Sequence, residues 1–178
     1  MFKRRIPLFL LLFSLSLHAD RYNTIEHAGD VMVLFLPATA YAKTAYEGDA
    51  QGALQFSLGL STTLATTFAL KYTIDAERPN GENSRSFPSG HSATAFSSAT
   101  FLQMRYGWEY GLPAYLGAGF VAWSRVYTEN HYTRDVVAGA ILGVVGSYIF
   151  TEKFQTKLTP IADNGIYGLS LSHSFSSY

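Results

Sequence analysis

Three short segments of the chain hold side chains whose types and spacing suit phosphate chemistry. The first is KYTIDAERP, residues 71–79, which contains Lys71, Arg78 and Pro79. Proline disfavours helical geometry in the residue before it, so the preceding helix should end before Arg78. Lys71 and Arg78 can then converge on one anion, because lysine offers a point charge and arginine a planar fork that matches phosphate.

The second segment is SFPSGHSATAF, residues 86–96. Its proline-serine-glycine sequence predicts a tight turn into a helix that starts near Ser92, and Gly90 allows backbone to approach a ligand closely. The first backbone N–H groups of such a helix have no partner within it and favour an anion. Ser89 is expected to cap the helix or donate to a phosphate oxygen, and His91 is placed to give a proton to a group bound there.

The third segment is SRVYTENHYTRD, residues 124–135, with Arg125, His131 and Asp135. If this segment is helical, His131 and Asp135 share one face, because they are four residues apart. A carboxylate bonded to one imidazole nitrogen leaves the other nitrogen as a nucleophile or base. Arg125 adds a third cation to the set.

The three segments together predict an oxyanion site rather than a metal site. Two histidines and an aspartate are also a metal-ligand set, but three cations and a helix N-terminus would repel a divalent ion. The same groups suit a phosphoryl group in its trigonal-bipyramidal form without a metal. We therefore expect no metal and no other cofactor.

The three segments also resemble a known family. Residues 71–79 match K-x6-R-P, residues 88–91 match P-S-G-H, and residues 124–135 match S-R-x5-H-x3-D. This pattern is similar to that of the type-2 phosphatidic acid phosphatase superfamily, which also includes bacterial class A acid phosphatases and vanadium haloperoxidases. All three motifs are complete and in order.

The resemblance implies a role for each residue. His131 would attack phosphorus and form a phosphohistidine, and Asp135 would orient His131. His91 would protonate the leaving oxygen and then activate water. The residues implied to hold the phosphate oxygens are Lys71, Arg78, Ser89, Gly90 and Arg125.

The elements that must position these residues are helices. Apolar residues recur at helical spacing in five segments, 30–46, 52–72, 92–106, 112–127 and 135–154. We predict an all-α fold, a bundle of about five to six helices with the active site in loops at one end. Alternating helix direction would place the loops at 72–90 and 125–135 on the same side.

The ends of the chain predict a division into three parts. Residues 1–19 have a basic start and a short apolar run, which is typical of a signal peptide or an N-terminal anchor. Residues 20–160 are expected to form the catalytic domain. Residues 161–178 are expected to form a C-terminal tail, either extended or disordered, with strand-like alternation near its end.

Composition excludes several function classes. Thirteen basic residues balance thirteen acidic ones, so there is no electrostatic footprint for nucleic acid. The chain has no cysteine, which excludes disulfides and thiolate metal sites. Mean hydropathy is close to zero, which leaves both a compact periplasmic domain and a membrane bundle open. The oligomeric state is not set by any of these features.

The resemblance leaves several functions open. We expect an exported, metal-independent phosphatase, in the periplasm or the inner membrane with its active site on the periplasmic side. Its implied substrates are phosphate monoesters or pyrophosphates of envelope lipids, such as phosphatidate, phosphatidylglycerophosphate, undecaprenyl pyrophosphate or lipid A. The alternatives are a soluble periplasmic acid phosphatase that takes small phosphoesters, and a vanadium haloperoxidase, which the short chain disfavours. A binding role would require all three motifs to be relics.

Overall fold

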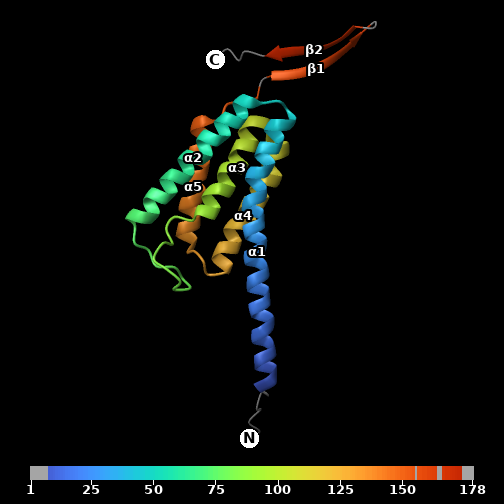
Figure 1. Ribbon diagram of the computed structural model, residues 1–178. Coiled ribbons are helices and arrows are strands. Elements are labelled where there is room, and N and C mark those ends of the chain that lie inside the picture. Colours follow the sequence, from blue (N-terminus) through green and yellow to red (C-terminus); the bar gives the residue numbers. More distant parts are fainter. Residues whose placement is uncertain (1–7, 155, 164–165, 174–178) are drawn as a thin grey trace.

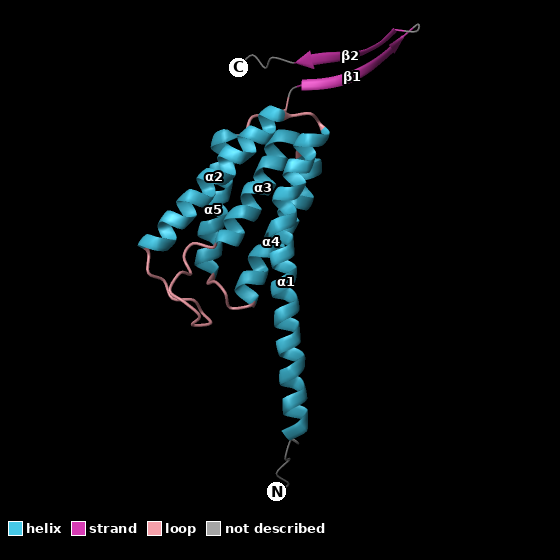
Figure 2. Cartoon of the chain, viewed as in Figure 1, coloured by secondary structure: helices cyan, strands magenta, loops and turns pink. Residues whose placement is uncertain are grey.

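The computed structural model describes residues 8–154, 156–163 and 166–173, and its main body is a bundle of five helices. The helices run antiparallel to their neighbours in sequence (Figure 1). Loops connect them at both ends, and two strands follow the last helix (Figure 2). The elements are α1 Leu8–Tyr46, α2 Ala50–Thr73, α3 Gly90–Tyr106, α4 Trp108–Tyr127, α5 Thr133–Phe150, β1 Thr156–Asp163 and β2 Ile166–His173.

The predicted all-α bundle is confirmed, and two helices start earlier than predicted. Helix α1 begins at Leu8, so the expected helix from residue 30 and the apolar run before it form one continuous helix. Its early part extends beyond the bundle (Figure 1). Helix α4 starts directly after Gly107, whose φ of +95° suits glycine at the reversal between α3 and α4. The expected division between residues 19 and 20 falls inside α1 and stays a prediction.

The C-terminal segment contains a two-stranded hairpin, which agrees with the extended form expected from residue 161, and the boundary itself stays a prediction. Strands β1 and β2 pair antiparallel, from Thr156 opposite His173 to Asp163 opposite Ile166. The alternating pattern near the end of the sequence is therefore a strand, and β1 crosses the boundary predicted at residue 160. The hairpin lies beyond the end of the bundle opposite to the loops at 74–89 and 128–132 (Figure 1).

Helix α3 forms the centre of the bundle. Its buried side chains are small over most of its length, and it packs against α1, α2, α4 and α5. Gly139 and Gly143 of α5 allow the closest approach, because a Cβ atom at these positions would lie 2.2 Å from the Ser89 carbonyl oxygen and 2.3 Å from that of Ala93. Two large aromatic residues, Phe56 and Phe101, stack at 4.8 Å within the apolar core.

A buried ion pair fixes the end of the bundle away from these loops. The Arg105 guanidinium donates to both carboxylate oxygens of Asp49, at 2.8 and 2.6 Å. The Asp49 carboxylate also accepts from the Gly52 backbone N–H, which caps α2, and from the Tyr106 hydroxyl. This network joins α2 and α3, so the two helices are held in register at that end.

Candidate active site

The predicted site residues gather at one end of the bundle, as the alternation of helix direction predicted. Helix α2 ends at Thr73, and the loop 74–89 leads into α3. Helix α4 ends at Tyr127, and the loop 128–132 leads into α5. Both loops and the start of α3 lie at the same end (Figure 1).

The turn into α3 has the predicted local structure. Ser89 is the N-cap residue, and its hydroxyl accepts from the Ser92 backbone N–H at 3.4 Å. The Ser89 backbone N–H donates to the Asp135 carbonyl at 2.9 Å, so this turn is fixed against α5. A Cβ atom at Gly90 would meet only Thr67, at 3.9 Å, which leaves space beside the backbone. Phosphate binding by Ser89 and Gly90 stays a prediction.

The His131 and Asp135 pair is connected through a third residue. His131 precedes α5 rather than lying within it, and its Nδ1 is 3.9 Å from Asp135 Oδ2. The Ser86 hydroxyl donates to Asp135 Oδ2 at 2.5 Å and lies 3.4 Å from His131 Nδ1. Asp135 Oδ2 also accepts from the Tyr132 backbone N–H at 3.1 Å, which caps α5. The direct carboxylate–imidazole hydrogen bond expected from an i, i+4 helical pair is thus replaced by a serine bridge.

Burial and neighbouring cations keep the His131 imidazole neutral. Burial is the main cause, and Lys71, Arg78 and His91 act in the same direction, so the pKa of His131 falls to about 3. Because Nδ1 faces Ser86 and Asp135, Nε2 is the ring nitrogen left for a substrate. A neutral ring with an unprotonated nitrogen is what a nucleophile requires.

Lys71 and Arg78 both lower the pKa of His131, and each bonds to a segment next to it, Lys71 to the Ser86 carbonyl and Arg78 to Asn130, both at 3.4 Å. Lys71 Nζ donates to the Arg85 carbonyl at 2.8 Å, which fixes it against the loop that carries Ser86. Arg78 donates through Nη1 to the exposed Glu82 carboxylate at 2.9 Å and to Asn130 Oδ1 at 3.4 Å. The convergence of these two cations on one anion stays a prediction.

Arg125 is bonded to protein groups, and phosphate binding by this residue stays a prediction. Its guanidinium is buried, and all three nitrogens have protein partners: Ser124 Oγ at 3.2 Å, Asp30 Oδ1 at 2.8 Å and the Glu26 carbonyl at 2.7 Å. Two of these partners belong to α1. His91 Nε2 lies 3.0 Å from the same Asp30 oxygen, so Arg125 and His91 meet at α1.

Sequence reasoning missed Ser86 and three residues around Arg125. Ser86 is the first residue of the segment 86–96, and the spacing of apolar residues in the sequence does not indicate that its side chain is buried. Asp30, a carboxylate within an apolar helical run, is a signal of function that was available in the sequence. Glu26 and Asn130, whose side chains bond to each other at 2.9 Å, gave no such signal.

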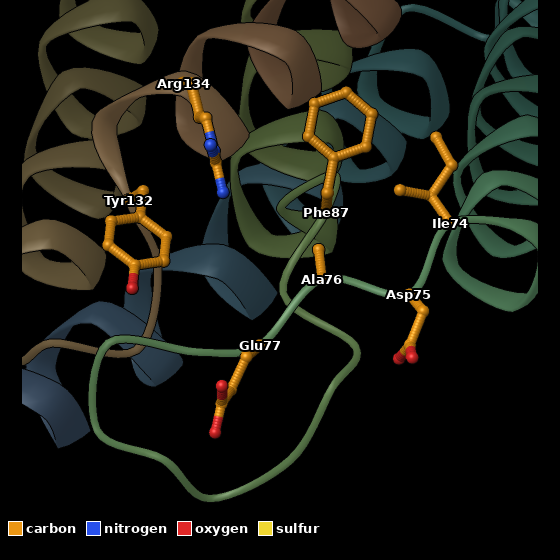
Figure 3. A pocket seen from close by; sticks show the side chains of 7 residues that line it. All are labelled: Ile74, Asp75, Ala76, Glu77, Phe87, Tyr132 and Arg134. Carbon is orange, nitrogen blue, oxygen red and sulfur yellow. The ribbon is translucent and has the colours of Figure 1, made fainter.

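A cavity of about 520 Å³ opens next to these residues. Its walls come from the loop after α2 and from the start of α5, and Phe87 and Tyr132 in the wall adjoin Ser86 and His131 in the chain (Figure 3). The wall combines apolar and charged side chains. The lining residues are Ile74, Asp75, Ala76, Glu77, Phe87, Tyr132 and Arg134.

Comparison with known proteins identifies the family. Residues 52–158 match the family model described as the PAP2 superfamily, and this match spans more than half of the chain. The chain belongs to the PAP2 superfamily, which confirms the resemblance seen in the three motifs.

Its relatives include phosphatases of one lipid class. The chain is 30% identical to the lipid A 4'-phosphatase of Helicobacter pylori (strain J99) over 165 residues, which are 84% of this chain and 83% of that protein. It is 37% identical to the lipid A 1-phosphatase of Porphyromonas gingivalis over 93 residues. That second match covers 50% of this chain and 21% of the relative, so the chain spans about a fifth of that protein.

Two solved structures share the fold. The crystal structure of Aquifex aeolicus LpxE aligns with a TM-score of 0.60 at 22% identity, over 82% of this chain and 87% of that one. The transmembrane PAP2 type phosphatidylglycerolphosphate phosphatase from Bacillus subtilis aligns with a TM-score of 0.57 at 25% identity, over 83% of this chain and 77% of that one. The likeness to LpxE shows the fold alone.

Two helices in the described part of the chain are long and apolar enough to cross a membrane, α2 and α5. Only 22% and 33% of their apolar windows are buried inside the molecule, whereas the core helix of a soluble protein would be mostly buried. Together with the likeness to the transmembrane phosphatase from Bacillus subtilis, this exposure points to a membrane protein. Large apolar side chains that are more than half exposed include Leu34, Phe35, Leu54, Phe68, Leu116, Ile141, Tyr148 and Ile149.

Proposed function

We propose that the chain hydrolyses phosphate from envelope lipids by way of a phosphohistidine on His131. The observation that carries this proposal is the buried His131, whose Nδ1 faces Ser86 and Asp135. Burial and the charges of Lys71, Arg78 and His91 lower the pKa of its ring, which favours the neutral form. The named activities of the relatives support a phosphoric monoester hydrolase. Among the lipid substrates, these names favour lipid A first.

The proposed reaction has two steps. In the first, His131 Nε2 forms a bond to phosphorus while the bond from phosphorus to the lipid oxygen breaks, and His91 gives that oxygen its proton. In the second, water attacks the phosphohistidine, His91 takes a proton from the water, and inorganic phosphate leaves with His131 neutral again. Asp135 stabilises the charge that forms on the His131 ring, acting through Ser86.

The phosphate would be held by cations and backbone donors. Lys71 and Arg78 would neutralise the equatorial oxygens, and the backbone N–H of Gly90, the first residue of α3, would add a donor, since the Ser89 N–H is bonded to Asp135. Arg125 needs a change of partners to contact phosphate directly, since its three nitrogens are bonded elsewhere. No step in this scheme requires a metal.

Exposed apolar side chains and the cavity favour a lipid substrate over a small soluble ester. The apolar faces of α2 and α5 would place the site near the bilayer surface, and the cavity beside Phe87 and Tyr132 would receive the part of the lipid next to its phosphate. We further propose that the chain is exported, with the site on the periplasmic side and residues 1–19 as signal or anchor.

Phosphate release by the purified protein in detergent tests the proposal. Lipid A and a water-soluble phosphomonoester would be compared side by side with EDTA present. We expect release from the lipid, retention of activity in EDTA, and loss of at least ~1,000-fold in His131→Ala, because the nucleophile is absent. Preference for the soluble ester would favour the acid phosphatase alternative, and full activity in His131→Ala would refute the phosphohistidine.

A further inference from the structure

Helix α1 contributes an acidic side chain to the site from outside the segment that defines the family. The family match begins at residue 52, and α1 ends at Tyr46. Asp30 Oδ1 nevertheless lies 3.0 Å from His91 Nε2 and 2.8 Å from Arg125 Nη1. One carboxylate oxygen therefore contacts both the proposed general acid and a buried cation.

The position of Asp30 is fixed by the packing of α1 against α4. A Cβ atom at the neighbouring Gly29 would lie 2.3 Å from Ser124 Oγ and 2.4 Å from Arg125 Nη2, so only glycine allows this approach. One turn earlier, the Glu26 carbonyl accepts from Arg125, and the Glu26 carboxylate accepts from Asn130. The contacts of Gly29 and Glu26 thus hold this part of α1, and Asp30 with it, close to His91, although the Asp30 side chain is 45% exposed.

The charges around His91 explain why a carboxylate is needed there. Burial lowers the pKa of His91, and Arg125 and Arg78 lower it further, while Asp30 raises it. His131, the other titratable neighbour, is neutral. Among the charged groups that act on His91, Asp30 is the one that favours the protonated ring, which is the form that a general acid requires.

We propose that Asp30 is a positioning residue for His91, an inference that rests on the proposed function. Asp30 accepts from the Nε2–H of His91, which fixes the ring and leaves Nδ1–H to protonate the leaving lipid oxygen. After that transfer His91 is neutral, with Nε2–H still bonded to Asp30. Nδ1 then takes the proton from the attacking water. Helix α1 is by this account part of the catalytic apparatus and more than an anchor.

The same geometry has a competing interpretation, which predicts the opposite change in kcat/KM when Asp30 is replaced. A carboxylate that binds Arg125 and His91 also resembles a substrate phosphate, so Asp30 would compete with substrate if it occupied the phosphate position. Removing its charge would then strengthen binding and raise kcat/KM. Removing a positioning residue lowers kcat/KM instead, so the two interpretations are separated by the direction of the change.

The test compares wild type with Asp30→Asn in detergent on two substrates, dodecyl phosphate and the water-soluble 4-nitrophenyl phosphate. An alkoxide leaving group needs the acid and 4-nitrophenolate hardly does, so we expect kcat/KM to fall about 10–100-fold for the first and no more than about threefold for the second. The basic limb of the pH profile should move to lower pH, because the protonated His91 has lost the anion that raises its pKa.

Two further variants complete the test. Glu47→Gln removes a carboxylate just beyond the other end of α1, where it pairs with Lys43, and should leave both activities unchanged. In a His91→Ala background, Asp30→Asn should cause no additional loss on dodecyl phosphate, since it acts through His91.

If Asp30→Asn lowered kcat/KM equally on both substrates and left the basic limb of the pH profile in place, the inference would be overturned. Asp30 would then act on Arg125 and not on His91. A higher kcat/KM in Asp30→Asn would overturn it in favour of competition with substrate. A wild-type protein that releases phosphate from neither substrate nor from lipid A would instead refute the proposed function itself, so the two failures are distinguishable.

Discussion

Ser86 supplies the hydroxyl that joins the two members of the predicted His131–Asp135 pair. It is fully buried, donates to Asp135 Oδ2 at 2.5 Å and lies 3.4 Å from His131 Nδ1. A hydroxyl can donate one hydrogen and accept another, so Ser86 can accept from Nδ1–H while it donates to the carboxylate. The His131 tautomer with Nε2 free then follows from this bridge.

Ser86→Ala should therefore lower kcat by about 10–100-fold, since a hydrogen bond to a charged group is worth about 1.5–3 kcal/mol. The KM for the lipid should change little, because the bridge contacts the nucleophile rather than the lipid chain. Ser84→Ala, two residues earlier in the exposed part of the same loop, is the matched control and should keep full activity. Equal kcat values for the two variants would show that Asp135 acts on His131 without the serine.

His131 also predicts how stability depends on pH. Its pKa is about 3 in the folded protein and about 6.5 when unfolded, so the unfolded state alone binds this proton between those values. Folding stability from this group is full above pH 6.5 and falls as pH falls toward 3. The thermal midpoint in detergent should drop more between pH 7 and pH 5 for wild type than for His131→Gln. If the thermal midpoints of wild type and His131→Gln dropped by the same amount, His131 would not be buried in its neutral form.

At the scale of elements, the close contact of α3 and α5 sets the position of the Ser89 turn. A methyl group at Gly139 would meet the Ser89 carbonyl oxygen at 2.2 Å, which is backbone and cannot move aside cheaply. Gly139→Ala should cost about 1–3 kcal/mol in the free energy of unfolding, as overpacked sites do, and should reduce activity by displacing the turn.

Gly119→Ala is the control for this prediction, because nothing lies within 4 Å of its added Cβ atom. It should be neutral or stabilise α4 by up to about 1 kcal/mol, as alanine does in a helix interior. Thermal unfolding and phosphate release would be measured for both variants. Normal activity in a stable Gly139→Ala protein would show that the turn tolerates a shift of α5.

The helices were predictable because apolar residues repeat at helical spacing and turns carry glycine, proline or a capping serine. The three motifs predicted which residues meet, since each stands at a helix boundary. The partners of Asp30 were not predictable, because they lie 61 and 95 residues away in the chain. The hairpin was missed in part because alternation is short in β1, where Pro160 interrupts the polar pattern.

At the scale of the whole molecule, charged groups gather at both ends of the bundle, and its middle presents apolar side chains outward. The site lies at the loop end, and the Asp49–Arg105 ion pair fixes the opposite end. Between them, α2 and α5 expose most of their apolar windows. In water such a surface would promote association, whereas in a bilayer it is the expected arrangement.

Ile141 provides the test of this arrangement, since it lies at the centre of α5 and is 57% exposed. If this face contacts lipid, Ile141→Lys should cost about 2.5–3.5 kcal/mol and reduce the yield of folded protein recovered from membranes. If it contacts water, an exposed isoleucine-to-lysine change is nearly neutral. Tyr46→Lys, at the end of α1 and 85% exposed, controls for the added charge and should be tolerated in either case. Membrane-fraction yield and thermal midpoint in detergent would be measured for both, and equal tolerance would place the α5 face in water and favour the soluble alternative.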